Sequence, residues 1–155
     1  MNTIGVDPGL RGAIACIFED GLVAVADMPT LKVIRNNKTK LEIDIVKLCV
    51  IFQSFGIAEA MVERPHAMPG QGVVSSFSLG KACGIIDGAL TAMMIPVSHV
   101  APATWKRDMG LSSDKNESRR LASQLYPSSS SLWKRVKDDG RAEAVLLAHY
   151  LRSVM

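Results

Sequence analysis

Hydrophobic and polar positions alternate in blocks along this chain, and the blocks predict strands first and helices later. The apolar, β-branched run from Thr3 to Val6 ends at an Asp-Pro-Gly turn and predicts a first strand. Two further apolar runs, Gly12 to Phe18 and Leu22 to Asp27, flank an Asp-Gly pair, which is a strong hairpin signal. The chain is therefore expected to open with three antiparallel strands, followed by a polar, basic loop over residues 30–40.

The later blocks predict helices separated by two short strands. Apolar residues recur at helical spacing from Leu41 to Phe55, and Gly56 closes that helix. Strands are expected within 57–63 and 95–100, and the first of them leads into a mobile loop over 66–73. Further helices are expected over 75–94, 102–109, 114–126 and 139–154. This order predicts a mixed five-stranded α/β sheet, antiparallel at its start, continued by crossover strands and flanked by helices.

Composition adds little that is unusual for a globular protein. The 155 residues fit one domain spanning 1–155, with 48% hydrophobic and 21% charged residues. No apolar run is expected to span a membrane, and the N-terminus lacks the pattern of a secretory signal. Cys16, Cys49 and Cys83 lie scattered in apolar stretches without metal-ligand spacing. They predict buried thiols in a reducing compartment, and hence a cytoplasmic protein.

Positive charge is concentrated in the last third of the chain. The net charge is only +3, yet nine of the eighteen Lys and Arg residues fall between Ala101 and Arg141. Such a segment is typical of a solvated helical surface, and it is also what a phosphate-binding face requires. The charge pattern alone leaves both interpretations open.

Four acidic residues occupy positions where their side chains are expected to converge. Asp7 and Glu63 end two predicted strands that would be neighbours in a crossover sheet, where α/β proteins place their ligands. Asp139 and Glu143 lie four apart, on one face of the last predicted helix. Such a cluster needs divalent cations to neutralise it, and its hard oxygen ligands select Mg²⁺ or Mn²⁺. Two such ions form the usual clamp for phosphodiester hydrolysis.

Each acid also has a simpler structural interpretation. Asp7 alternatively caps the turn that follows it, and Glu63 alternatively pairs with Arg64 or with a surface lysine. Glu143 is alternatively an ordinary acid on an exposed helical face. Asp139 is a good helix N-cap, a role that Asp138 fills equally well, which leaves open which of the two is the fourth carboxylate ligand. The combination of all four acids favours the catalytic interpretation.

The motifs around these acids resemble those of the RuvC family of Holliday-junction resolvases, which have an RNase H-like fold. Residues 4–9 (Ile-Gly-Val-Asp-Pro-Gly) resemble the first RuvC motif, and 62–65 (Val-Glu-Arg-Pro) resemble the second. Residues 78–84 are similar to the small-residue helix that follows, which helps to form a symmetric dimer in that family. Residues 139–144 resemble the final carboxylate motif, particularly as it reads in phage-type members. The similarity covers nearly the whole chain.

The resemblance implies a homodimeric endonuclease that resolves four-way DNA junctions by paired symmetric nicks, using two Mg²⁺ or Mn²⁺ ions per active site. It implies metal ligation by Asp7, Glu63, Asp139 and Glu143, and phosphate contact near the cut by Lys106 and Lys115. Residues expected to hold the DNA arms are Arg119, Arg120, Lys134, Arg135 and Lys137. Residues expected to contact DNA from the second motif and its loop are Arg64, Met68 and Gln71, with Met68 as an apolar wedge.

Two departures from the family pattern keep alternatives open. The last two acids are four apart rather than three, and Gly140 occupies the three-apart position. The loop after the second motif lacks a base-stacking aromatic residue before Phe77. The alternatives are a related RNase H-like nuclease that acts on other branched DNA or on hybrids, and a non-catalytic junction-binding protein.

Overall fold

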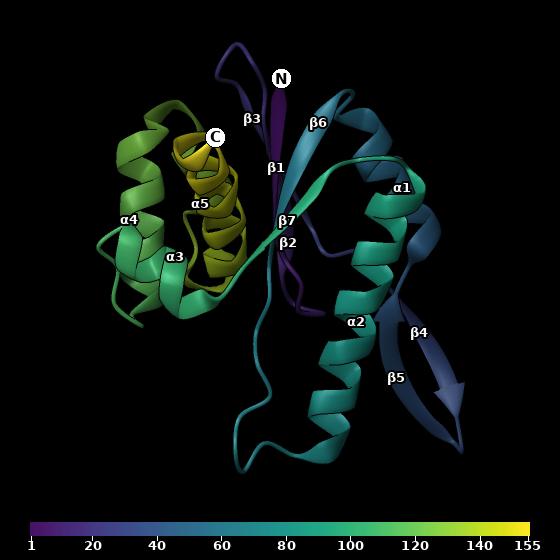
Figure 1. Cartoon of the computed structure of the whole chain (residues 1–155). Coiled ribbons are helices and arrows are strands. Elements are labelled where there is room, and N and C mark those ends of the chain that lie inside the picture. The colour runs from purple at the N-terminus through teal and green to yellow at the C-terminus, as the bar shows by residue number, and fades with distance from the viewer.

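A five-stranded sheet forms the central layer of the molecule, and the computed structural model describes all 155 residues (Figure 1). Its strands are β1 (Asn2–Asp7), β2 (Ala13–Ile17), β3 (Val23–Asp27), β6 (Ala58–Glu63) and β7 (Val97–Val100). Their order is β3-β2-β1-β6-β7. The first three pair antiparallel, and β6 and β7 join in parallel, which confirms the predicted mixed sheet.

Helices cover both faces of this sheet. They are α1 (Ile45–Ser54), α2 (Val73–Ala92), α3 (Pro102–Asp108), α4 (Lys115–Leu125) and α5 (Asp139–Val154). Helices α1 and α2 lie on one side of the sheet, and α3, α4 and α5 lie on the other (Figure 1). Two short 3₁₀ helices, η1 (Pro127–Trp133) and η2 (Val136–Asp138), join α4 to α5. Residues 127–131, including the four serines that follow Pro127, are therefore helical.

The two faces of the sheet carry separate hydrophobic cores because side chains alternate along each strand. Ile4 and Val6 of β1 belong to the core shared with α1 and α2, together with Phe52 and Ile86. On the opposite face, Met61 of β6 belongs to the core beneath α5. Residues of β1 are buried on both faces, as a central strand requires.

The prediction of a loop over residues 30–40 is wrong. The segment forms a hairpin of its own, β4 (Thr30–Arg35) and β5 (Lys38–Ile43), which does not join the main sheet. Its turn residues Asn36 and Asn37 have φ of 49° and 57°, as a two-residue hairpin turn demands. Asparagine tolerates this conformation well, so the Asn-Asn pair was the local signal that the polar character of the segment concealed.

The hairpin also shortens the helix that follows. The predicted helix from Leu41 begins instead at Ile45, and the side chain of Asp44 accepts a hydrogen bond from the backbone N–H of Lys47. This is the N-cap interaction that favours Asp before a first helical turn.

Helix α2 has the 20 residues that the sequence predicted, but it begins and ends two residues earlier, at Val73 and Ala92. By length and composition alone this helix is apolar enough to cross a membrane. Only 22% of its apolar 18-residue stretch is buried within the protein. Helices that pack against the core of a soluble protein meet the same criteria, and α2 packs on the sheet through Ile86 and Leu90.

Candidate active site

Two of the predicted carboxylates lie side by side at the ends of neighbouring strands. Asp7 ends β1 and Glu63 ends β6, and these strands pair in parallel with Val6 opposite Val62. Alternation along β1 places Asp7 on the face opposite to Ile4 and Val6, which is the face that α5 covers. Glu63 shares that face with Met61. The side chains of both acids therefore face α5.

Helix α5 approaches β1 unusually closely because Gly5 has no side chain. A Cβ at Gly5 would lie 2.0 Å from the carbonyl oxygen of Ala144 and 2.4 Å from the amide nitrogen of Ala148, both in α5. A Cβ at Gly140, in the first turn of α5, would lie 3.1 Å from Oδ2 of Asp7. The two glycines thus let the start of α5, with Asp139 and Glu143, come against the strand ends.

The electrostatics of the site reflect this convergence of acids. Burial, followed by the charges of Glu63 and Glu143, raises the pKa of Asp7 from its ordinary value of 3.8 to about 7. Burial and Glu143 also raise the pKa of Glu63, against the opposing hydrogen bond from Trp105. Negative charge at this point is therefore disfavoured unless a cation compensates it.

Two lysines supply part of that compensation. Nζ of Lys106 lies 2.8 Å from Oε1 of Glu143, and Nζ of Lys115 lies 2.7 Å from Oδ2 of Asp139. Lys106 belongs to α3 and Lys115 begins α4, so both helices direct a cation at the acids. With four carboxylates against two ammonium groups, the fully ionised cluster keeps two uncompensated negative charges.

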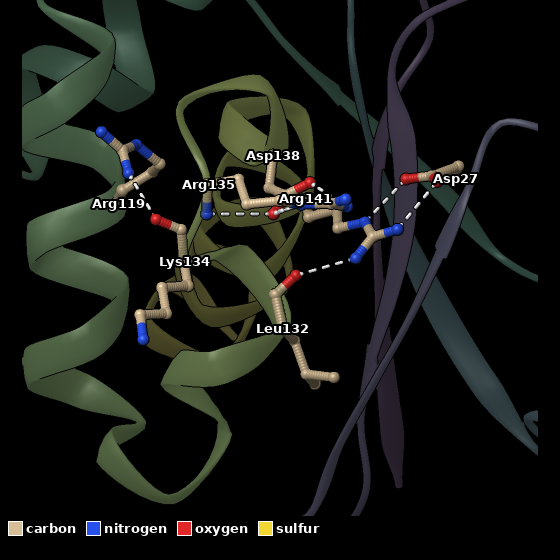
Figure 2. Close-up of polar contacts among 7 residues, drawn as sticks. All are labelled: Asp27, Arg119, Leu132, Lys134, Arg135, Asp138 and Arg141. Atoms are coloured by element: carbon tan, nitrogen blue, oxygen red, sulfur yellow. Dashed lines mark hydrogen bonds and ion pairs between the residues drawn. The ribbon is translucent and has the colours of Figure 1, made fainter.

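The structure separates the roles of the adjacent acids Asp138 and Asp139. Asp138 is buried, and its carboxylate accepts hydrogen bonds from the side chain and the backbone N–H of Arg135 (Figure 2). These contacts lower its pKa, the largest cause being the side-chain hydrogen bond from Arg135. Asp139 instead pairs with Lys115. Of the two, Asp139 is the one that lies with the acid cluster.

Three of the five predicted arm-binding cations line one hollow, and the other two lie outside it. Arg119, Arg120 and Lys134 line an open hollow of about 570 Å³ beside α4. Within it, Nη1 of Arg119 donates to the backbone carbonyl of Lys134 (Figure 2). Arg135 is held by Asp138, as described above, while Lys137 is exposed.

Arg64, which follows β6 directly, contacts α2 and β7. Nη2 of Arg64 lies 3.0 Å from Oδ2 of Asp87 in α2 and 3.1 Å from Nε2 of His99 in β7. Met68 is exposed, and its backbone N–H donates to the side chain of Gln71. Arg64 is thus engaged by Asp87, and Glu63 does not pair with it.

Two residues of the site were missed by sequence reasoning. Nε1 of Trp105 donates a hydrogen bond of 2.8 Å to Oε1 of Glu63, and the hydroxyl of the buried Ser118 lies 3.4 Å from Oε1 of Glu143. Each comes from a helix that precedes α5. The position of Trp105 directly before Lys106 was visible in the sequence, but its partner lies 42 residues away.

The chemistry of the donors suits a hard divalent cation, because every candidate ligand is a carboxylate oxygen. The side chains as placed form no group of three or more potential ligands close enough to hold an ion. Glu143 and Asp139 point to their lysines, so metal binding requires these carboxylates to turn toward Asp7.

The chain has the mixed five-stranded sheet of an RNase H-like α/β fold, and its strand-end acids face a helix that carries two more acids. No family model matches the chain. One relative is the protein named Holliday junction resolvase MOC1, chloroplastic, of Chlamydomonas reinhardtii, which is 34% identical over 89 residues, or 56% of this chain. The chain spans about a tenth of that relative's length (10%).

Solved structures of similar fold superimpose on almost the entire chain. The RuvC of T. thermophilus in complex with a Holliday junction superimposes with a TM-score of 0.67 at 11% identity, covering 99% of this chain and 96% of that one. The yeast mitochondrial Holliday junction resolvase Ydc2 gives a TM-score of 0.54 at 13% identity, covering 96% and 76%. The chain is therefore RuvC-like in fold, and the resemblance predicted from its sequence is confirmed.

The raised pKa of Asp7 predicts a pH-dependent stability penalty in the metal-free protein. Between about pH 4 and 7 the folded state binds more protons than the unfolded state, so stability falls as pH rises. Asp7→Asn removes this penalty. In EDTA we expect the variant to exceed the parent in unfolding free energy by roughly 2–4 kcal/mol at pH 7.5, and by less than about 1 kcal/mol at pH 4.

Denaturant titration at the two pH values measures this difference. Asp20→Asn, the same chemical change in an exposed turn, serves as the control and is expected to leave the pH dependence unaltered. Equal stability of Asp7→Asn and the parent at pH 7.5 would show that the Asp7 carboxylate is not under electrostatic strain.

Proposed function

We propose that this protein is a metal-dependent endonuclease that resolves four-way DNA junctions, with residues 1–155 forming a single nuclease domain. The observation that carries the proposal is the convergence of four carboxylates at the strand ends of a RuvC-like fold. The named functions of MOC1, of the T. thermophilus RuvC and of Ydc2 support the choice of substrate. The three cysteines are free thiols, in keeping with a reducing cytoplasmic compartment.

Asp7, Glu63, Asp139 and Glu143 would hold two Mg²⁺ or Mn²⁺ ions. When bound, a pair of such ions activates water and stabilises the leaving oxygen of a phosphodiester. Asp7 is central because it lies between Glu63 on the neighbouring strand and the first turn of α5. Its raised pKa supports this assignment, since a divalent cation would stabilise the ionised carboxylate against its burial and against the charges of Glu63 and Glu143.

Lys106 and Lys115 would act on the phosphate at the cut. Each contacts a carboxylate of the cluster now, so each ammonium group lies within reach of an anion bound there. With Glu143 and Asp139 serving as metal ligands, both lysines would be free to neutralise the charge that grows on the phosphate oxygens in the transition state. Trp105 would position Glu63 through its hydrogen bond.

Cations outside the cluster would hold the arms through phosphates, without reading sequence. Arg119, Arg120 and Lys134 do so from their shared hollow, which lies on α4 beyond Lys115. Arg135 and Lys137 extend this contact, while Arg64, Met68 and Gln71 meet DNA from the loop after β6.

Helix α2 is the proposed contact between two copies of the chain. Gly80, Gly84 and Gly88 repeat every four residues on its exposed side, and a Cβ at any of them would meet nothing within 4 Å. A stripe of glycines allows two helices to approach closely, and a two-fold dimer brings two active sites to a two-fold junction. This proposal accounts for a long apolar helix that is only partly covered.

Gly84→Lys is predicted to convert the dimer into a monomer. The new side chain has open space in a single chain, so the fold tolerates it, but it obstructs a close helix pair and adds an unpaired charge. Light scattering after gel filtration is expected to give twice the chain mass for the parent and the chain mass for the variant. Gln53→Lys, exposed on α1, should keep the dimer. A parent protein that is already monomeric would refute the proposal.

The function is tested with an end-labelled immobile four-way junction in Mg²⁺, Mn²⁺ or EDTA. We expect metal-dependent paired nicks at symmetric positions, and much slower cutting of linear duplex. Faster cutting of flaps, forks or RNA–DNA hybrids would instead identify a related RNase H-like nuclease. Junction binding without cleavage in either metal would identify a non-catalytic junction-binding protein.

A further inference from the structure

The β4–β5 hairpin is a compact cationic element that none of the assignments above uses. It carries four basic residues, Lys32, Arg35, Lys38 and Lys40, and its single acid is Glu42. The hairpin stands apart from the main sheet and lies beside the N-terminal half of α2 (Figure 1). A positively charged protrusion of this kind attracts an anionic partner.

The strand register sorts these cations onto two faces. Arg35 is paired with Lys38 and Val33 with Lys40, so Arg35, Lys38 and Lys40 project from one face. Lys32, paired with Leu41, projects from the other. The three-cation face includes Glu42 and is the one joined to α2, because Nζ of Lys81 lies 2.9 Å from Oε1 of Glu42.

Between the hairpin and α2 lies a hollow of about 320 Å³, lined from both faces of the hairpin and within the roughly 300–1,000 Å³ typical of ligand sites. Its rim carries Arg35, Lys40 and Lys81, against which Glu42 is the only acid. Its walls are largely apolar, formed by Leu10, Leu41, Ile43, Val74, Phe77 and Ile85. The ring of Phe77 is 74% exposed, so one of its faces is open to a partner.

The hollow adjoins a second one that reaches the turn after β1. A second hollow, lined by Gly9, Leu10 and Arg11 on one side and by α2 on the other, shares Leu10, Val74 and Ser78 with the first. Gly9 lies beside Asp7, since a Cβ there would be 4.0 Å from Oδ1 of Asp7. The two hollows together form a groove that runs from the hairpin, past Arg11, to Gly9 in the turn that follows Asp7.

We propose that this groove binds an unpaired DNA strand leaving the site of cleavage, with a base in the apolar hollow against Phe77 and phosphates along Arg35, Lys38 and Lys40. Apolar, aromatic walls with a cationic rim match the two faces of a single strand, its bases and its phosphates. A duplex covers its bases and offers the walls nothing to bind. The inference rests on the proposed function, because that function supplies the strand.

Fluorescence anisotropy in EDTA tests the inference with a labelled 15-nucleotide oligo(dT) and a duplex of equal length. Lys40→Glu is expected to weaken oligo(dT) binding about tenfold, because it removes one phosphate contact and adds a repulsive charge. Binding of the duplex should change less than about twofold. Lys32→Glu makes the same charge change on the opposite face of the same hairpin, and we expect it to alter neither affinity.

Phe77 provides a second, independent measurement. Phe77→Ala is expected to weaken oligo(dT) binding about tenfold, and Phe77→Trp to retain it, since stacking on a base tolerates any aromatic ring. A 2-aminopurine in the oligonucleotide should lose fluorescence on binding the parent and the Trp variant, but not the Ala variant. Light scattering on each variant controls for altered assembly.

Equal losses for Lys40→Glu and Lys32→Glu, or equal losses for duplex and single strand, would overturn the inference. Because these measurements need no cleavage, they separate it from the proposed function. Selective loss of oligo(dT) binding in Lys40→Glu supports the groove even if the parent protein cuts no junction. If Lys40→Glu binds oligo(dT) as tightly as the parent protein does, and both proteins cut junctions, the inference is refuted while the proposed function stands.

Discussion

Asp7→Asn is expected to lower the rate of junction cleavage at least about 1,000-fold while junction binding is retained. Asp7 lies between Glu63 and the first turn of α5, so losing its charge removes the ligand on which both proposed ions depend. Removal of one group that stabilises a transition state typically costs about 10²–10³ in rate, and a shared metal ligand exceeds that. The oxygen and shape of the side chain are preserved, so the fold should survive.

Single-turnover cleavage of a labelled junction in Mg²⁺ measures this rate, and gel retardation in EDTA measures binding. Asp20→Asn is the matched control, with cleavage expected within about twofold of the parent. Cleavage by Asp7→Asn at a tenth of the parent rate or faster would exclude Asp7 as a shared metal ligand. Loss of binding together with cleavage would indicate a disturbed fold instead.

Gly5→Ala is expected to destabilise the protein by about 3 kcal/mol or more, a large effect for a single methyl group. The added Cβ would lie 2.0 Å from the carbonyl oxygen of Ala144 and 2.4 Å from the amide nitrogen of Ala148. These are backbone atoms of α5, so no side-chain rotation relieves the clash. The helix must move away from β1, which also separates Glu143 from Asp7.

Urea unfolding gives the free-energy difference. Gly72→Ala before α2 is the control, since its Cβ would approach nothing closer than 3.9 Å and its φ of −61° suits alanine. We expect that variant to lose less than about 1 kcal/mol. A midpoint for Gly5→Ala that matches the Gly72→Ala midpoint would show that α5 does not depend on the close approach.

Local sequence patterns predicted the elements of the central sheet and the positions of its acids. The apolar runs that end in Asp7 and Glu63 placed both residues at strand ends, and the spacing of Asp139 and Glu143 placed both on one helical face. These predictions depend on side-chain periodicity and turn chemistry, which act over a few residues. The same reasoning failed for residues 30–40, where charged side chains obscured a hairpin that its Asn-Asn turn specifies.

The partners of these acids were decided by the tertiary structure alone. Whether Asp138 or Asp139 lies with the acid cluster depends on Arg135, which holds Asp138 away from it. That Trp105 donates to Glu63 depends on how α3 packs against the end of β6. Such contacts join residues distant in sequence, and no periodicity encodes them.

The sequence by itself therefore determined which elements form, where the acids stand on them, and which known family the chain resembles. Only the tertiary structure decided which face of β1 meets α5, and hence which carboxylates converge, because the absence of a side chain at Gly5 admits that helix. It also decided that the basic hairpin stands beside α2 and forms a groove with it. Packing of two surfaces depends on their shapes together, a property that neither segment carries alone.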